Sequence, residues 1–227
     1  MTKLEYPPLF RLYELEIKPE KKAEFVALGQ RNLSLSIKTE PQTLAMHATH
    51  SDEKGLENLI FELYQDTAAQ KRHQASPQFQ KYATFAKNAI VNRKVVDLIP
   101  ELLLEKFDFL GKGTPDKITV KLAKLQLEKA SAAAFKAAVF SEMHQAIVLE
   151  PGVLAMYAAT IQNKPDEWIF LEFYQDKQAY AKHRKTPHFK EYIKKTTELV
   201  AKKELLDLTA DTLVSQGNLS YERGAFA

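Results

Sequence analysis

The sequence predicts an α+β protein of two ferredoxin-like (βαββαβ) repeats packed as a pseudo-dimeric α+β barrel. The first observation is an ungapped internal repeat, because Glu40-Pro41 recurs 110 residues later as Glu150-Pro151. The second is the order of strand and helix patterns, which is the same in both copies. The third is that a sheet covered by helices on one side leaves an apolar face, which a twin sheet can bury.

The repeat extends over most of the chain. Its period is longer than the roughly 20 to 50 residues of a solenoid unit, so we expect two fused copies of a small domain. The boundaries predicted are a first domain over 1–108, a linker over 109–116 that contains two glycines and a proline, and a second domain over 117–227. Further matched positions are Leu44-Ala45-Met46 with Leu154-Ala155-Met156, Tyr64-Gln65-Asp66 with Tyr174-Gln175-Asp176, and Asp97-Leu98 with Asp207-Leu208.

The first half of each repeat reads as a strand followed by a helix. Apolar and polar residues alternate over 9–17, which predicts a strand, and Lys18-Pro19 ends it. Apolar residues then recur at helical spacing from Phe25 to Ile37. Glu40-Pro41 should stop this helix, because a residue before proline is pushed out of helical geometry.

The second half reads as a hairpin, a divided helix and a last strand. Residues 43–50 and 59–65 predict the hairpin. Asp66 is placed to cap the next helix, and Ser76-Pro77 should start its second piece, with serine as cap and proline at the first helical position. Residues 95–98 and the run after Pro100 predict the last strand.

The second copy repeats these steps in order. It predicts a strand over 118–127, a helix over 130–149 that stops at Glu150-Pro151-Gly152, a hairpin, and caps at Asp176 and Thr186. The two copies should form an internal pseudo-dimer, and further pairing into a homodimer is compatible with the pattern.

Composition excludes several classes of protein. The 227 residues are 45% apolar and 27% charged, and no stretch reaches the roughly 20 apolar residues of a membrane span, so we expect no membrane insertion. No basic run accompanies the net charge of +3, so we expect no nucleic-acid partner. The N-terminus lacks the apolar core of a signal peptide, which favours a cytoplasmic protein. The absence of cysteine removes thiol nucleophiles and thiolate-bound metals.

The second copy resembles the antibiotic biosynthesis monooxygenase (ABM) family. The residues that carry this resemblance are Glu150-Pro151-Gly152, Glu172-Phe173-Tyr174-Gln175-Asp176, Ala179, His183, Thr186-Pro187-His188-Phe189 and Tyr192, and most recur in the first copy. The resemblance implies the fold of this family, a dimeric α+β barrel. Family members with known chemistry include cofactor-independent quinol monooxygenases, anthrone oxygenases, haem-degrading oxygenases and an isomerase. Where haem-degrading relatives carry the proximal histidine, this chain has Ala83 and Ile193, so haem is not expected. The first copy has Gln42 and Gln78 in place of Gly152 and His188, so the second copy is the better match and the favoured functional half.

His73 and His183 are the candidate general bases. They occupy the same place in both copies, and the unperturbed pKa of histidine lies nearest neutral pH. An imidazole there could take a proton from a hydroquinone or an enol, and the electron-rich oxyanion could then pass an electron to dioxygen. The alternative is that each histidine only packs at a helix break.

Other candidate residues surround these histidines. Glu62 and Glu172 share a strand face with an aromatic residue and could orient the base, while Tyr82 and Tyr192 could donate to a substrate oxygen; core packing is the alternative for each. The candidate substrate-binding residues, which suit a flat aromatic pocket, are Met46, Met156, Tyr64, Tyr174, Phe79 and Phe189. No metal-ligand spacing and no glycine-rich phosphate loop is present, so we expect no metal and no cofactor.

The function expected from these observations is a cofactor-independent monooxygenase or oxidase of small quinol-like or polyphenolic molecules. Its partner would be a small aromatic or quinone-like molecule. Two alternatives stay open. One is an isomerase or tautomerase of a small carbonyl compound, which would use the same base without oxygen. The other is a non-catalytic barrel that binds a small ligand.

Overall fold

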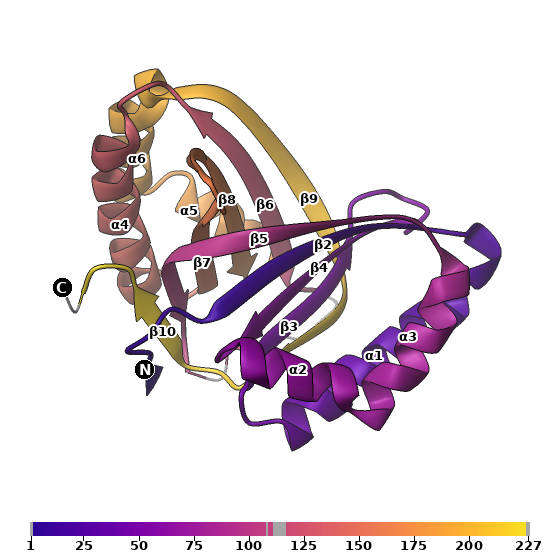
Figure 1. Ribbon diagram of the computed structural model, residues 1–227. Helices are drawn as coiled ribbons and strands as arrows, with labels where there is room; N and C mark the ends of the chain where they lie inside the picture. The colour runs from indigo at the N-terminus through magenta and orange to yellow at the C-terminus, as the bar shows by residue number, and fades with distance from the viewer. Residues whose placement is uncertain (1, 108, 111–116, 226–227) are drawn as a thin grey trace. The chain divides into compact units, whose positions relative to one another are not determined.

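The computed structural model describes every residue except 1, 108, 111–116 and 226–227. Strand and helix follow one another in the same order in both repeats (Figure 1). The elements of the first repeat are β1 (Thr2–Lys3), β2 (Leu9–Ile17), a short 3-10 turn (Pro19–Lys21), α1 (Lys22–Thr39), β3 (Thr43–His50), β4 (Glu57–Tyr64), α2 (Thr67–Ala75), α3 (Pro77–Ala89) and β5 (Ile90–Glu105). Those of the second are β6 (Thr119–Leu127), α4 (Ala132–Leu149), β7 (Val153–Ile161), β8 (Lys164–Tyr174), α5 (Lys177–His183), α6 (Pro187–Thr196), a 3-10 turn (Thr197–Leu199), β9 (Val200–Ser215) and β10 (Leu219–Glu222).

The predicted helix boundaries rest on caps that the structure contains. The carboxylates of Asp66 and Asp176 accept hydrogen bonds from the backbone N–H of Ala69 and Ala179, both at 2.7 Å. Ser76 and Thr186 cap α3 and α6 in the same way, each followed by proline. The predicted start of α4 was two residues early, because Ala130 has a φ of 63°, which is outside helical geometry.

The chain divides into two compact units that do not coincide with the two repeats. We call Tyr6–Leu98 with Leu208–Gly217 the first unit, and Met1–Glu5 with Ile99–Asp207 and Asn218–Ala227 the second unit. Each unit therefore takes the end of one long strand from the other repeat. The domain boundaries at 108 and 117 stay a prediction, and most of the linker lies outside the described residues, although Phe109 is buried against Phe173 within the second unit.

The sheet of the first unit is antiparallel. β2 pairs with β4 and with the first part of β5, from Phe10 opposite Leu98 onward. β3 pairs with β4 on one side and with the end of β9 on the other, where Ala45 lies opposite Ser215. Helices α1, α2 and α3 pack on this sheet (Figure 1), and apolar residues such as Phe25 and Ile60 form the core between the two layers.

The second unit is built in the same way. β8 pairs with β6 and β7, and β5 continues into this unit, where Leu104 lies opposite Ser220 of β10. Hydrogen-bonded neighbours within this unit follow the order β1-β10-β5-β7-β8-β6-β9. The core of the second unit holds Phe135, Met143 and Trp168 between helix and sheet.

The last strand of the first repeat is longer than predicted. β5 begins at Ile90, ahead of the predicted segment 95–98, and continues through Pro100 to Glu105. The pairing of β5 with β2 ends at Leu98, and the pairing of β5 with β10 begins at Leu102. Pro100 lies between these two ladders, so its missing N–H removes no hydrogen bond from either of them.

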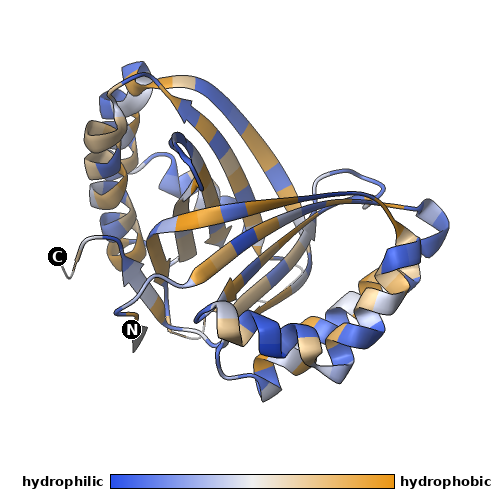
Figure 2. Ribbon diagram, viewed as in Figure 1, coloured by the Kyte–Doolittle hydropathy of each residue, from blue (hydrophilic) through white to orange (hydrophobic). Residues whose placement is uncertain are grey.

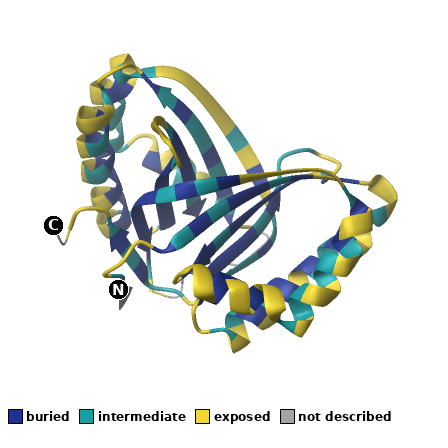
Figure 3. Cartoon of the chain, viewed as in Figure 1, coloured by how far each residue is buried: buried dark blue, intermediate teal, exposed yellow. Residues whose placement is uncertain are grey.

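Exposed and buried residues are distributed differently over the helices and the strands. Exposed residues gather on the outward surfaces of the helices in Figure 3, and most of the buried residues lie on the strands. In Figure 2 the surface of α2 is mostly hydrophilic, whereas α4 carries hydrophobic residues along much of its length. None of the helices in the described ranges is long and apolar enough to cross a membrane.

Candidate active site

A tyrosine and a glutamate on the third strand of each repeat form a hydrogen-bonded pair. The Tyr64 hydroxyl donates to Glu62 Oε2 at 2.8 Å, and the Tyr174 hydroxyl donates to Glu172 Oε2 at 2.7 Å. The alternation of a strand places both residues on the face toward the helices. Burial raises the pKa of both phenols, so each tyrosine acts as a fixed donor.

The two candidate histidines are buried and held by the glutamate that ends the first helix. His73 Nδ1 lies 3.0 Å from Glu40 Oε2, and His183 Nδ1 lies 2.8 Å from Glu150 Oε1. The edge of the His183 ring also packs on Phe189, with centroids 4.8 Å apart. The carboxylate requires Nδ1 to carry the proton. Sequence reasoning used these glutamates only as helix stops, although their recurrence before proline in both copies was a signal.

A third side chain completes each of these networks. In the first repeat Gln78 Nε2 donates to Glu40 Oε1 at 2.7 Å. In the second repeat His188 Nε2 donates to Glu150 Oε1 at 2.6 Å, so this carboxylate receives two imidazole N–H groups. The replacement of Gln78 by His188 therefore keeps the hydrogen bond.

Glu142 is a functional candidate that sequence reasoning missed. It lies on α4 with 5% of its surface exposed, where the first repeat has Asn32. Its Oε1 lies 3.6 Å from His183 Nε2. Burial, and secondarily the nearby Glu172 and Glu150, raise the pKa of Glu142 to about 9. An acidic residue within an otherwise apolar helix face was the signal that could have identified it.

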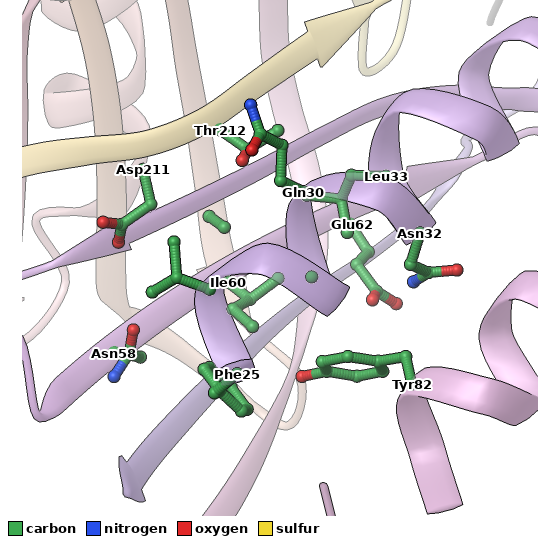
Figure 4. Close-up of a pocket in the computed structure, with 13 residues that line it drawn as sticks. Phe25, Gln30, Asn32, Leu33, Asn58, Ile60, Glu62, Tyr82, Asp211 and Thr212 are labelled. Carbon is green, nitrogen blue, oxygen red and sulfur yellow. The ribbon is translucent and has the colours of Figure 1, made fainter. Parts of the chain in front are cut away.

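Each unit contains a cavity between its helices and its sheet, and the two cavities differ in size. That of the first unit is about 20 Å³, little more than the space of a water molecule, and Figure 4 shows Glu62 and Tyr82 at it. That of the second unit is about 900 Å³. Its lining includes Glu172, Tyr192 and Glu142.

The structure thus separates the predicted site residues into two groups. Glu62, Tyr82, Glu172, Tyr192 and Phe189 line a cavity. The others lie behind that lining in the packed interior, namely His73, His183, Met46, Met156, Tyr64 and Tyr174. Phe79 contacts the ring of His73 and does not line the small cavity.

One substitution between the repeats changes the space beside the sheet. Tyr13 on β2 and Ala123 on β6 occupy the same register, opposite Ile60 and Phe170 respectively. The Tyr13 ring is buried in the core of the first unit, and its hydroxyl accepts a hydrogen bond from Gln70 Nε2 at 3.3 Å. An alanine leaves that volume open in the second unit.

Four residues of the second unit could together hold a metal ion. One ligand atom from each of Glu142, Glu150, His183 and His188 lies within 4.8 Å of the others. The first repeat has Asn32 and Gln78 at the positions of Glu142 and His188, and side-chain amides are poor ligands for transition metals. The hydrogen bonds to Glu150 account for the close approach of both imidazoles without an ion.

We therefore expect the protein to bind no stoichiometric transition metal. Elemental analysis of the purified protein should find less than one equivalent of zinc, iron or copper, and dialysis against a chelator should leave the melting temperature unchanged. A stoichiometric metal that is lost in a Glu142→Gln variant would contradict this expectation.

Glu142 should make stability fall as pH rises. The folded protein keeps the proton on this carboxyl up to about pH 9, whereas the unfolded chain releases it near its ordinary pKa. Unfolding between these values releases a proton, so the free energy of unfolding should decrease by up to about 1.4 kcal/mol per pH unit. Glu142→Gln should remove this slope in denaturant titrations between pH 5 and 9, and Glu204→Gln on an exposed strand is the control. An unchanged slope in the first variant would show that Glu142 is ionised in the folded state.

The fold and site define a class, the α+β proteins with paired ferredoxin-like repeats and a cavity between helices and sheet. Within that class the model of the family "Antibiotic biosynthesis monooxygenase" matches residues 8–84 and 119–195. The chain belongs to the antibiotic biosynthesis monooxygenase (ABM) family.

Solved structures with the same two-repeat arrangement match the whole chain. A protein from Lactobacillus acidophilus NCFM named "putative monooxygenase" is 31% identical with a TM-score of 0.88, covering 95% of this chain and 99% of its own. A protein of the same name from Fusobacterium nucleatum is 18% identical with a TM-score of 0.88, covering 97% of this chain and 100% of its own. An anthrone oxidase-like protein is 11% identical with a TM-score of 0.56, covering 93% and 94%. No curated protein matches the chain. The predicted fold class, a pseudo-dimeric α+β barrel of tandem repeats, is confirmed.

Proposed function

We propose that the protein is a cofactor-independent monooxygenase or oxidase that acts on small quinol-like or polyphenolic molecules in the cavity of the second unit. Membership of the ABM family and the likeness to proteins named as monooxygenases support the reaction class. The observation that carries the proposal is the cavity of about 900 Å³, which brings Glu172, Glu142 and Tyr192 to one space. The cavity beside Glu62 and Tyr82 in the first unit, at about 20 Å³, is too small for such a substrate.

Glu172 is the proton acceptor in this proposal. Its Oε2 receives the Tyr174 hydroxyl, and among the described residues no partner occupies Oε1. A carboxylate placed beside a bound hydroquinone can take the phenolic proton and leave an electron-rich oxyanion. Two electrons then pass to dioxygen. In an oxidase the products are a quinone and hydrogen peroxide, and in a monooxygenase one oxygen atom enters the ring while the other leaves as water.

His183 acts on the cavity through Glu142 rather than by touching the substrate. Its Nδ1 is held by Glu150, and its Nε2 lies 3.6 Å from Glu142 Oε1, which belongs to the cavity lining. Burial keeps Glu142 protonated, so Glu142 is a donor toward the substrate or toward reduced oxygen, with His183 beside it. Phe189 and Tyr192 pack along the cavity and suit a flat aromatic ring.

Oxygen uptake with menadiol tests this function. Glu172→Gln should lower kcat by about 100-fold or more, the range that a positioned general base supplies. Glu62→Gln is the matched control, because it removes the equivalent carboxylate from the repeat with the small cavity and should leave the rate unchanged. Equal losses in both variants would contradict the assignment to the second unit.

The alternatives give different results in the same assay. Turnover of a carbonyl compound without oxygen uptake would replace the proposal by an isomerase. The absence of turnover for every quinol tried, with ligand still bound, would leave a binding barrel. A His73→Ala and His183→Ala double variant that retains the full rate would exclude both histidines from the reaction.

A further inference from the structure

The cavity of the second unit has more positive than negative charge around it. Its lining contains five basic side chains, namely Lys121, Arg184, Lys185, Lys190 and Lys203, and three acidic ones, Glu142, Glu172 and Asp207. Lys121 is already paired with Asp207, and its Nζ lies 4.2 Å from the centroid of the Tyr180 ring. The other four basic residues are exposed and have no carboxylate partner among the described residues.

The acidic residues of the lining do not neutralise these four cations. Asp207 forms an ion pair with Lys121. Glu142 carries a proton at neutral pH because burial raises its pKa. Glu172 is the one other acidic residue of the lining, and its Oε2 accepts the Tyr174 hydroxyl. The local field therefore favours a negative group on a bound molecule.

The first repeat provides an internal comparison. At the positions of Arg184, Lys185 and Lys190 it has Gln74, Ala75 and Gln80. The only remaining cation of this group is Arg93, which lies over the Tyr13 ring at 5.4 Å, the same ring that fills the space. Three of the four unpaired cations thus occur only in the repeat whose cavity is open. Cations that served only solubility would be expected equally in both repeats, whether or not the cavity is open.

The remaining lining is apolar. The residues that provide it are Leu122, Val139, Met143, Phe170, Phe189 and Leu206. Arg184 lies 5.8 Å from the centroid of Tyr180, so cationic and aromatic groups adjoin at the cavity. A ligand that fits both parts has a flat apolar body and an anionic substituent.

We propose that the second unit binds an aromatic carboxylate or a similar aromatic anion, whose charge is recognised by Arg184, Lys185, Lys190 and Lys203. This names the substrate class of the proposed function and rests on that function for turnover, whereas binding can be measured separately. Arginine and lysine recognise carboxylates and phosphates through charge-assisted hydrogen bonds. The pairing of an anionic end with an apolar body also fixes which end of the ring reaches Glu172.

Two ligands with the same ring test the inference. Binding of 1-hydroxy-2-naphthoate and of 1-naphthol is measured by calorimetry on the full chain, since neither has the hydroquinone that reacts with oxygen. Wild type should bind the carboxylate about ten-fold or more tightly than the naphthol. This preference should weaken between 0.05 and 0.5 M NaCl, because exposed charges are screened over about 10 Å or less at these concentrations.

A triple variant isolates the cations. Arg184→Gln, Lys185→Ala and Lys190→Gln together introduce the residues of the first repeat, so they should be tolerated and should remove the preference while leaving naphthol binding unchanged. Lys71→Ala, Lys81→Gln and Lys87→Gln remove the same charge from exposed helix positions of the first repeat and should keep the preference. Equal affinity of wild type for the two ligands, or a preference that survives the first triple variant, would overturn the inference.

The two proposals fail separately. If the carboxylate is preferred but no quinol, with or without a carboxylate, consumes oxygen, the function is wrong and the ligand class stands. If menadiol consumes oxygen while wild type shows no preference for the anion, the function stands and the inference is wrong.

Discussion

The Ala123→Tyr variant is expected to lose quinol turnover and ligand binding almost completely. Residue 123 has the register of Tyr13, whose ring fills the corresponding space of the first unit. A tyrosine at this position should fill part of the large cavity and leave the carboxylate of Glu172 unaltered. Because substrate could no longer reach its reactive position, we expect kcat/KM to fall by at least about 100-fold.

Stability separates this blockage from misfolding. Overpacking a filled core costs about 1 to 3 kcal/mol, whereas a side chain that enters an open cavity should cost less. The melting temperature and the circular dichroism of Ala123→Tyr should therefore remain close to wild type. Ala123→Ser controls for substitution at this position and should keep its activity. Full activity in the tyrosine variant would show that catalysis takes place elsewhere.

The complementary variant Tyr13→Ala should destabilise the first unit without adding activity. It removes a buried ring and leaves Gln70 without its acceptor, and large-to-small core changes of aromatic residues cost about 3 to 5 kcal/mol. The first repeat also lacks the equivalent of Glu142, since it has Asn32. A gain of turnover at an unchanged melting temperature would contradict this account.

A fragment that ends after residue 112 is expected not to give a folded monomer. It lacks Leu208–Gly217, which belongs to the first unit and pairs with β3 from Ala45 to His50. Its own run from Ile99 to Glu105 would also lose the second unit in which Leu102, Leu103 and Leu104 are buried. An unpaired strand edge and an exposed apolar run both promote association.

Light scattering after gel filtration measures the outcome. We expect oligomers or precipitate from the fragment alone. Coexpression with residues 113–227 should restore a soluble complex of the two pieces, because it supplies the missing strands. A monodisperse monomer with cooperative unfolding would show that the first repeat completes its sheet without the exchanged strand.

Much of the fold could be predicted because its signals are local. The alternation over 9–17 gave the observed strand, and Asp66 and Ser76 gave the observed helix starts, since a cap acts on N–H groups only two or three residues away. The exchange of β2 for β10 as the partner of β5 on either side of Pro100 could not be predicted in this way, because both partner strands are distant in the chain.

The candidate site shows the same division. Glu172 and Tyr192 could be named from the sequence because residue type and strand or helix position indicate which face they occupy. The location of His183 behind the cavity lining could not be predicted from the sequence. It follows from a buried hydrogen bond to Glu150, which lies 33 positions earlier in the chain. Glu142 was missed because its role depends on His183 and Glu172, which come from other elements.

The order of residues therefore determined the tandem repeat, its strands and helices, and the family to which it belongs, because propensity, caps and period act over a few residues. Only the tertiary structure decided that each unit borrows a strand end from the other repeat, that one cavity is open and the other filled, and which carboxylates line it. Volume and buried charge depend on side chains brought together from distant parts of the chain, and two similar repeats can therefore fold alike while substitutions such as Tyr13 against Ala123 give their cavities different linings.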